Sequence, residues 1–142
     1  MTDLAAATIC TVIPGLRYRD APGAIDWLCR VLGFEKHLVH ADGDLVHHAQ
    51  LKFGNGMIML SSAAQGSPWD ARFVLPDDIG GRQTQCCCLI VADADAHYAR
   101  AKAAGAVIID ELADREYGGR GYGLRDPEGH LWWFETYDPW KT

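Results

Sequence analysis

The chain repeats one pattern of signals at a spacing of about 73 residues, and this repeat constrains the fold more than any other feature. Asp20 precedes a segment with apolar residues at helical spacing, and Gly33 follows it. Asp93 and Gly105 bound a second, alanine-rich segment in the same way. The two aspartates are 73 residues apart and the two glycines 72. The spacing predicts two equivalent helices, one in each half of the chain.

Short apolar stretches surround each predicted helix. One candidate strand lies before each helix, within residues 7–18 and 84–91. After each helix, apolar stretches meet at a turn, predicted at Asn55-Gly56 in the first half and at Glu128-Gly129 in the second. Each half is therefore predicted to fold as a strand, a helix and about three strands. The chain is expected to be an α+β protein of two tandem βαβββ modules.

We expect one domain over residues 1–142, with module one at about 8–64, a linker at 65–83 and module two at about 84–138. The linker is rich in Gly, Pro and Asp and lacks periodicity. A half-sheet with one helix buries too little apolar surface alone, so duplication supplies a partner. Two curved sheets side by side would also leave a concave surface that can hold a small molecule.

Composition argues against several classes of protein. Hydrophobic residues make up 49% and charged residues 23%, the balance of a folded domain. The net charge of −6, without a run of Lys or Arg, predicts no nucleic-acid partner and no anionic-membrane partner. The N-terminus has an acid where a secretory signal carries basic residues, and no long apolar stretch occurs, which favours a cytoplasmic protein. Five cysteines, three of them consecutive, do not suggest a disulfide framework.

Four segments of the chain resemble one known family. They lie at residues 14–35, 46–62, 93–110 and 117–139, and the last contains the most specific motif, "YGGRGYGLRDPEGHLW". These segments are similar to the glyoxalase / bleomycin resistance protein / extradiol dioxygenase family, the vicinal oxygen chelate superfamily. The resemblance implies paired βαβββ modules, a homodimer and, in many members, a metal held by side chains from the first and last strand of each module.

The family's metal-ligand positions can be placed on the repeat. They fall on Ile13, Leu60, Cys86 and Trp133. Three of these four residues lack a donor atom, whereas an enzymatic metal centre needs about three nitrogen, oxygen or thiolate ligands. We therefore expect no metal cofactor. An alternative stays open, in which Glu135, with help from His48, binds Zn, Ni, Mn or Fe, although an acid near the end of an edge strand more often faces water or pairs with Arg.

Strict alternation along residues 45–53 predicts which side chains share a face. One face would carry Val46, His48, Gln50 and Lys52, and the other, the core face, His47, Ala49, Leu51 and Phe53. His48 and Gln50 would then face either solvent or the cleft. His48 is either a hydrogen-bonded strand residue or a general base or ligand contact.

The glycine-rich segment before the last motif places Arg120 and Tyr122 on one face of a strand. An Arg and a phenol can anchor an anionic or hydroxylated ligand. The alternative is a structural role, in which Arg120 pairs with a carboxylate such as Asp126 and fixes the turn.

Two functions of different classes follow. The first is a metal-independent protein of the resistance or sequestration kind that binds a small apolar or planar molecule. Its ligand contacts would be Ile13, His48, Gln50, Met59, Cys86, Arg120, Tyr122 and Trp133. The alternative is a metal-dependent enzyme, a glyoxalase-type lyase or isomerase or an extradiol dioxygenase, which uses Glu135 and His48. The absent metal ligands favour the first.

Overall fold

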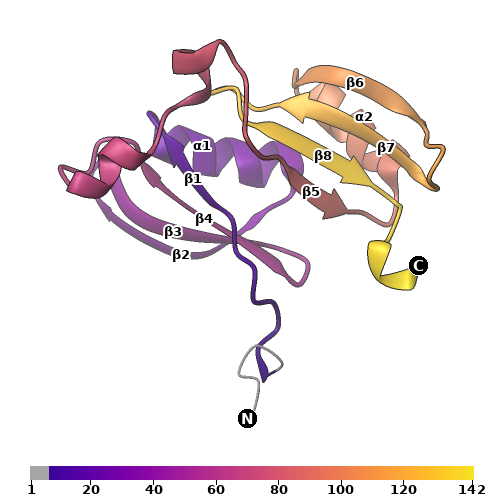
Figure 1. Cartoon of the computed structure of the whole chain (residues 1–142), viewed down its shortest axis with the longest axis horizontal. Coiled ribbons are helices and arrows are strands. Elements are labelled where there is room, and N and C mark those ends of the chain that lie inside the picture. The colour runs from indigo at the N-terminus through magenta and orange to yellow at the C-terminus, as the bar shows by residue number, and fades with distance from the viewer. Residues whose placement is uncertain (1–6) are drawn as a thin grey trace. The chain divides into compact units, whose positions relative to one another are not determined.

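The computed structural model describes residues 7–142, and the chain divides into two compact units between Leu75 and Pro76. The opening residues 1–6, on which part of the expectation of no secretory signal rests, lie outside the described range. Each unit contains one four-stranded mixed sheet and one α-helix (Figure 1). The protein is therefore α+β with two βαβββ modules, as the repeat predicts.

The first unit contains module one, drawn in indigo to magenta in Figure 1. Its elements are β1 (Gly15–Tyr18), α1 (Ala21–Trp27), a π-helical turn (Leu28–Leu32), β2 (Glu35–Asp42), β3 (Leu45–Phe53) and β4 (Gly56–Ser62). The strand order is β1-β4-β3-β2, in which β1 is parallel to β4 and the other pairs are antiparallel.

The first helix begins and ends where the sequence predicts. The side chain of Asp20 accepts a hydrogen bond from the backbone N–H of Gly23 at 3.0 Å. Gly33, with φ of 93°, ends the helical segment in the left-handed conformation that glycine adopts without strain. Its buried face carries Ala21, Ala24, Ile25, Leu28, Val31 and Leu32.

The second unit contains module two, which ends in yellow in Figure 1. Its elements are β5 (Cys87–Ile90), α2 (Ala94–Ala103), β6 (Val107–Asp114), β7 (Arg120–Arg125) and β8 (Leu131–Glu135). Asp93 caps α2 by accepting a hydrogen bond from Ala96 N at 3.0 Å. The strand order is β5-β8-β7-β6, so β8 is an internal strand, parallel to β5 and antiparallel to β7.

Short 3₁₀ helices lie outside the sheets, at Pro68–Arg72 (η3), Pro76–Ile79 (η4) and Pro139–Lys141 (η5). The predicted linker is therefore partly ordered. Arg17 of β1 pairs with Asp70 of η3 at 2.8 Å, and its guanidinium lies 4.4 Å from the Phe73 ring centroid. The hydrogen bond from Arg17 lowers the pKa of Asp70 below its ordinary value. No helix in the described range is long and apolar enough to cross a membrane.

The predicted position of the first hairpin turn is wrong by one residue. Phe53 pairs with Gly56, so the two-residue turn is Gly54-Asn55, and Gly54 has a φ of 57°. The second hairpin has a longer loop, which is closed by a hydrogen bond from Asp126 N to His130 O at 2.9 Å. Because the two loops differ in length, the constant spacing between the halves does not continue into β4 and β8.

Each sheet has one face that carries its module's buried core and one face turned away from it, here called the distal face. Core-facing residues are Leu16, Tyr18, Ala49, Leu51, Ile58 and Leu60 in the first sheet and Leu89, Tyr122, Leu124, Trp132 and Phe134 in the second. The distal faces carry Gly15, Arg17, His48, Gln50, Met59 and Ser61 in the first sheet and Cys88, Ile90, Gly121, Gly123, Trp133 and Glu135 in the second.

One irregularity in β3 contradicts the predicted alternation. His40 pairs with His48, but the next residue, Ala41, pairs with Val46, so His47 is the extra residue of a β-bulge. The shift turns Val46 into the core and leaves His47 exposed, the reverse of the prediction. The rest of the strand alternates as predicted.

Candidate functional site

The indole ring of Trp133 lies over two glycines on the distal face of the second sheet. Gly123 pairs with Trp133 and Gly121 with Glu135. A Cβ atom at Gly123 would lie 3.1 Å from Trp133 Cε3, and one at Gly121 would lie 3.2 Å from Trp133 Cζ2. Glycine within a strand often marks such a close approach. The absence of side chains at these two glycines of β7 therefore lets the indole ring pack directly against the strand.

Arg115 also holds the Trp133 ring in place. Its guanidinium carbon lies 4.6 Å from the ring centroid, within the range of a cation–π contact. The guanidinium Nη2 donates hydrogen bonds to Gly121 O at 2.7 Å and to Glu111 O at 2.9 Å, and it lies 3.6 Å from a carboxylate oxygen of Asp110. Because these contacts fix the Arg115 side chain, its contact with the ring is preorganised.

Glu135 fixes the orientation of the indole. Its Oε2 accepts a hydrogen bond from Trp133 Nε1 and another from the Tyr117 hydroxyl at 3.0 Å. Glu135 is only 6% exposed, and the expectation that it stands on an edge strand is wrong because β8 lies between β5 and β7. A buried carboxylate needs such donors. Burial and the hydrogen bond to Glu135 raise the pKa of Tyr117, so its hydroxyl stays a donor at neutral pH.

The turn between β6 and β7 brings Arg115 and Tyr117 to this site. Backbone hydrogen bonds close the turn, from Arg115 N to Gly119 O at 2.9 Å and from Gly118 N to Arg115 O at 3.0 Å. Gly119 has a φ of 71°, and a Cβ there would lie 2.6 Å from the backbone N of Tyr137. Only glycine fits this position. Arg115 is a functional residue that was not predicted from the sequence, although its position three residues before the Gly118-Gly119 pair is a signal for it.

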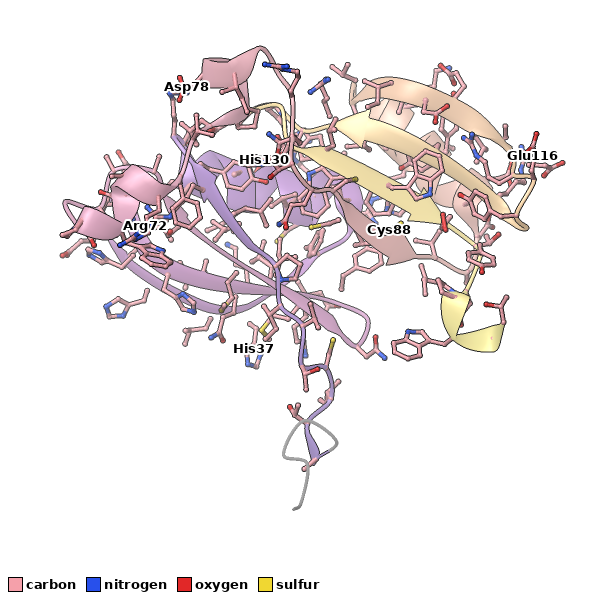
Figure 2. All side chains as sticks on the ribbon, viewed as in Figure 1. His37, Arg72, Asp78, Cys88, Glu116 and His130 are labelled. Carbon is pink, nitrogen blue, oxygen red and sulfur yellow. The ribbon has the colours of Figure 1, made fainter. Side chains whose placement is uncertain are left out.

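Two cysteines belong to the strand on the other side of β8, or lie just before it. Cys88, labelled in Figure 2, pairs with Trp133 across the parallel strands and is exposed on the distal face. Partial burial of the thiol, followed by the nearby charge of Glu135, raises its pKa to about 11. Cys86 lies just before β5, and burial raises its pKa as well. Both thiols are therefore neutral near pH 7 and line the face as small apolar groups.

Three of the predicted ligand contacts lie together on the distal face of the first sheet. Gln50 pairs with Met59 across β3 and β4, and Gln50 Nε2 lies 3.1 Å from His48 Nε2. All three side chains are half-buried. Ile13, also half-buried, lies two residues before β1 rather than within it. His48 is therefore hydrogen-bonded to Gln50 within the strand, and Met59 lies opposite Gln50.

The placement of a metal-ligand position on Leu60 is wrong. Leu60 is 2% exposed and faces the core of its module. Gly15 pairs with Met59 in the first sheet, and Cys88 pairs with Trp133 in the second. The residue equivalent to Trp133 is therefore Met59, because the shorter turn of the first hairpin shifts the count by one.

Arg120 and Tyr122 share a face as predicted, but the structure does not bring them to Trp133. Tyr122 is fully buried, and its hydroxyl lies 2.7 Å from His97 Nδ1 on α2. Arg120 pairs with Asp95 of α2 and with Asp114 of β6, each at 3.1 Å. These two carboxylates raise the pKa of Arg120 above its ordinary value. Both predicted contacts thus connect the sheet to α2.

Asp126 fixes the second hairpin loop through hydrogen bonds rather than through Arg120. Its Oδ1 accepts from the backbone N–H groups of Glu128 and His130, each at 3.0 Å. Its Oδ2 accepts from Trp132 Nε1 at 3.0 Å. Arg120 does pair with carboxylates, as the structural alternative expects, but they are Asp95 and Asp114, so the example of Asp126 and the role in fixing this turn are wrong.

The residues at the family's metal positions do not fit a divalent metal centre of that kind. Ile13 and Trp133 offer no donor atom, and Met59 and Cys86 offer a thioether and a protonated thiol. Within residues 7–142, no group of three or more His, Cys, Asp or Glu side chains is arranged to hold a metal ion. His48 and Glu135, the alternative ligands, belong to different units and are hydrogen-bonded within their own unit.

Comparisons with known proteins agree with this architecture. The sequence profile of the Glyoxalase/Bleomycin resistance protein/Dioxygenase superfamily matches residues 9–134. The uncharacterized protein Mb0911c of Mycobacterium bovis is 31% identical over 121 residues, which are 84% of this chain and 78% of the relative.

Solved structures share the fold as well. TioX from Micromonospora sp. ML1 is 38% identical, with a TM-score of 0.71 over 89% of this chain and 98% of that one. The fosfomycin resistance protein FosX from Mesorhizobium loti is 15% identical, with a TM-score of 0.63 over 92% and 94%, and shares the fold alone. The chain therefore belongs to the glyoxalase/bleomycin resistance protein/dioxygenase superfamily.

Proposed function

We propose that this protein binds a small apolar or planar molecule without a metal, and that Trp133 is the centre of the binding surface. The observation that carries the proposal is the fixed indole ring at a position where many relatives carry a metal ligand. Gly121 and Gly123 support the ring, Arg115 contacts it, and Glu135 accepts its N–H. A ring that is already ordered loses little conformational entropy when a ligand binds to it.

The neighbouring strand extends this apolar surface. Ile90 is 45% exposed and shares the distal face with Cys88 and Trp133. An exposed apolar patch with a few polar groups at its rim is typical of a small-molecule surface. Ile13, His48, Gln50 and Met59 remain proposed contacts from the first module. Arg120 and Tyr122 are proposed to support the site indirectly, since they connect β7 to α2.

We propose resistance or sequestration as the biological role, because the described site offers a stacking surface and its residues do not fit a metal centre of the family's kind. We also propose that the protein forms a homodimer, as the family resemblance implies. Light scattering of the purified protein would then give a mass of about twice the 15.6 kDa of one chain. A mass of one chain would contradict the dimer without affecting the site.

The experiment that tests the proposal combines metal analysis with ligand titration. Untagged protein is analysed by plasma mass spectrometry before and after chelation and after addition of Zn, Ni, Mn and Fe. A panel of planar aromatic compounds is then titrated while tryptophan fluorescence is followed, with and without EDTA. We expect substoichiometric metal and a saturable fluorescence change that EDTA does not alter.

Two substitutions assign the signal. Trp133→Phe is expected to remove the ligand-dependent change, whereas Trp140→Phe, at a ring that is 91% exposed, is the matched control that keeps it. Stoichiometric metal whose removal abolishes binding would contradict the proposal. It would favour the metal-dependent lyase, isomerase or dioxygenase, and Glu135→Gln and His48→Ala would then identify the ligands.

A further inference from the structure

We infer that Glu135 makes the site selective for planar ligands that carry an N–H or O–H donor at the edge of the ring. The inference rests on the proposed function, since it assigns a specificity to the same surface. It gives the two oxygens of one carboxylate different tasks. Oε2 holds Trp133, and Oε1 recognises the ligand.

The hydrogen bonds of Glu135 use only one of its oxygens. Oε2 accepts from Trp133 Nε1 and from Tyr117, and no described residue donates a hydrogen bond to Oε1. Among the side chains of residues 7–142, the buried polar atom without a hydrogen-bond partner is Arg115 Nε. Oε1 of Glu135 therefore keeps contact with solvent although the residue is 6% exposed. A carboxylate oxygen in this state is a strong acceptor that is only partly hydrated.

The position of Oε1 relative to the ring determines what it can recognise. The indole N–H edge of Trp133 points to Glu135, so a ligand that packs against the ring has an edge beside the carboxylate. Ile90 pairs with Glu135 across the strands and offers an apolar contact on the same face. An N–H or O–H group on the ligand would donate a hydrogen bond to Oε1. A bare acceptor would be placed beside a negative oxygen and would lose its own hydration without a partner.

The positive charge of Arg115 favours a ligand whose donor group is neutral. Its guanidinium lies 4.6 Å from the Trp133 ring centroid and places a positive charge at the same surface. A cationic ligand would be attracted by Glu135 and repelled by Arg115, whose charge Asp110 partly offsets at 3.6 Å, whereas a neutral amide, indole-type N–H or hydroxyl keeps the hydrogen bond without that repulsion.

Indole and benzofuran are a suitable pair of probes, because they have nearly the same planar shape and differ by an N–H donor in one and an ether oxygen in the other. Each is titrated into the full chain, and dissociation constants are measured by ligand-detected NMR. We expect wild-type protein to bind indole about five- to tenfold more tightly than benzofuran, the ratio that one hydrogen bond to a partly buried acceptor supports.

Glu135→Gln tests the assignment directly. The amide oxygen can take over the hydrogen bonds from Trp133 and Tyr117, which leaves the amide NH₂ toward the ligand. The preference for indole should then vanish or reverse. Tyr117→Phe is the matched control, because it removes one donor from Oε2 and leaves Oε1 unchanged. It should keep the preference, and circular dichroism checks that both variants are folded.

The outcomes separate this inference from the proposed function. Equal binding of both probes by wild-type protein overturns the selectivity and leaves the stacking surface in place. Indole preference that survives in Glu135→Gln also overturns it, because the donor would then be recognised elsewhere. If wild-type protein binds neither probe, nor any member of the planar panel, the proposed function fails and the selectivity fails with it.

Discussion

Trp132 and Trp133 are neighbours in β8, and each donates its indole N–H to a carboxylate, yet the two rings serve different ends. Trp132 is 1% exposed and faces the core, where it bonds to Asp126 of the hairpin loop. Trp133 faces the opposite side, lies over the glycines of β7 and bonds to Glu135. Because side chains alternate along a strand, Trp132 points into the core and stabilises the fold, whereas Trp133 points to the distal face.

The two carboxylates explain the difference. Asp126 uses both oxygens within its own hairpin, on two backbone N–H groups and one indole. Glu135 uses one oxygen to hold Trp133 and Tyr117. A carboxylate whose hydrogen-bonding capacity is fully used stabilises structure, whereas one with a remaining acceptor can take part in recognition.

The largest effect is expected when Asp126 is changed to Ala. The substitution removes the carboxylate that accepts hydrogen bonds from the buried Trp132 Nε1 and from the backbone N–H of His130. The free energy of unfolding should fall by about 2–4 kcal/mol. Denaturant unfolding measures it, with Asp126→Asn as a milder control because it keeps one acceptor oxygen. A loss below about 1 kcal/mol would show that the loop does not depend on this carboxylate.

A smaller loss of stability is expected for Gly121→Ala. The new Cβ would lie 2.8 Å from Glu135 Cβ and 3.0 Å from the backbone O of Phe134, so the backbone must shift. We expect a loss of about 1–3 kcal/mol, together with weaker ligand binding as Trp133 is displaced. Gly15→Ala is the control, because nothing lies within 4 Å of a Cβ there. Equal free energies of unfolding for the two variants would show that the packing of Trp133 does not depend on glycine at position 121.

Exchanging each tryptophan for Phe tests the division between fold and surface. Trp133→Phe should weaken binding of a planar ligand by about tenfold and change stability little. Trp132→Phe should lower the free energy of unfolding by about 1–2 kcal/mol and leave the affinity of the folded protein nearly unchanged, since it removes the buried bond to Asp126. The account of β8 is wrong if the two variants exchange these effects in calorimetric titration and unfolding.

The smallest effect concerns the thiols of β5. Burial raises the pKa of both Cys87 and Cys88 to about 11, above the ordinary value of 9.0. Only the thiolate reacts with a disulfide reagent, so both should react slowly at pH 7.5, and the rate should rise about tenfold per pH unit below pH 11. Because the folded protein keeps these thiols protonated, their contribution to stability is full below pH 9 and is lost as the pH rises toward 11. Reaction of Cys88 as fast as the exposed Cys10 would contradict the raised pKa.

The sequence predicted those features whose cause lies within a few residues. Asp20 caps a helix through a backbone N–H three residues away, and Gly33 ends the segment through its own φ. The sequence could not choose between Gly54-Asn55 and Asn55-Gly56 for the first turn, because both pairs suit a tight hairpin and the pairing of β3 with β4 decides. This error of one residue in the turn displaced the predicted metal-ligand position from Met59 to Leu60.

The candidate site depended on contacts between distant residues. Tyr117 reaches Glu135 from 18 residues earlier in the chain, and the burial of Glu135 follows from the place of β8 between β5 and β7. Alternation correctly put Arg120 and Tyr122 on one face but could not say that this face packs on α2. Trp133 could be predicted because its distance along the chain from the hairpin loop can be counted in the sequence. The contacts that Arg115, Tyr117 and Glu135 make with it cannot be counted in this way.

The most direct test of the central claim is the indole ¹⁵N–¹H resonance of Trp133 in metal-stripped protein, assigned with Trp133→Phe and titrated with a planar aromatic compound. If Trp133 is the centre of a metal-free binding surface, this resonance shifts saturably with ligand while elemental analysis shows no stoichiometric metal. A Trp133 resonance that stays unchanged until stoichiometric metal is restored would contradict the claim.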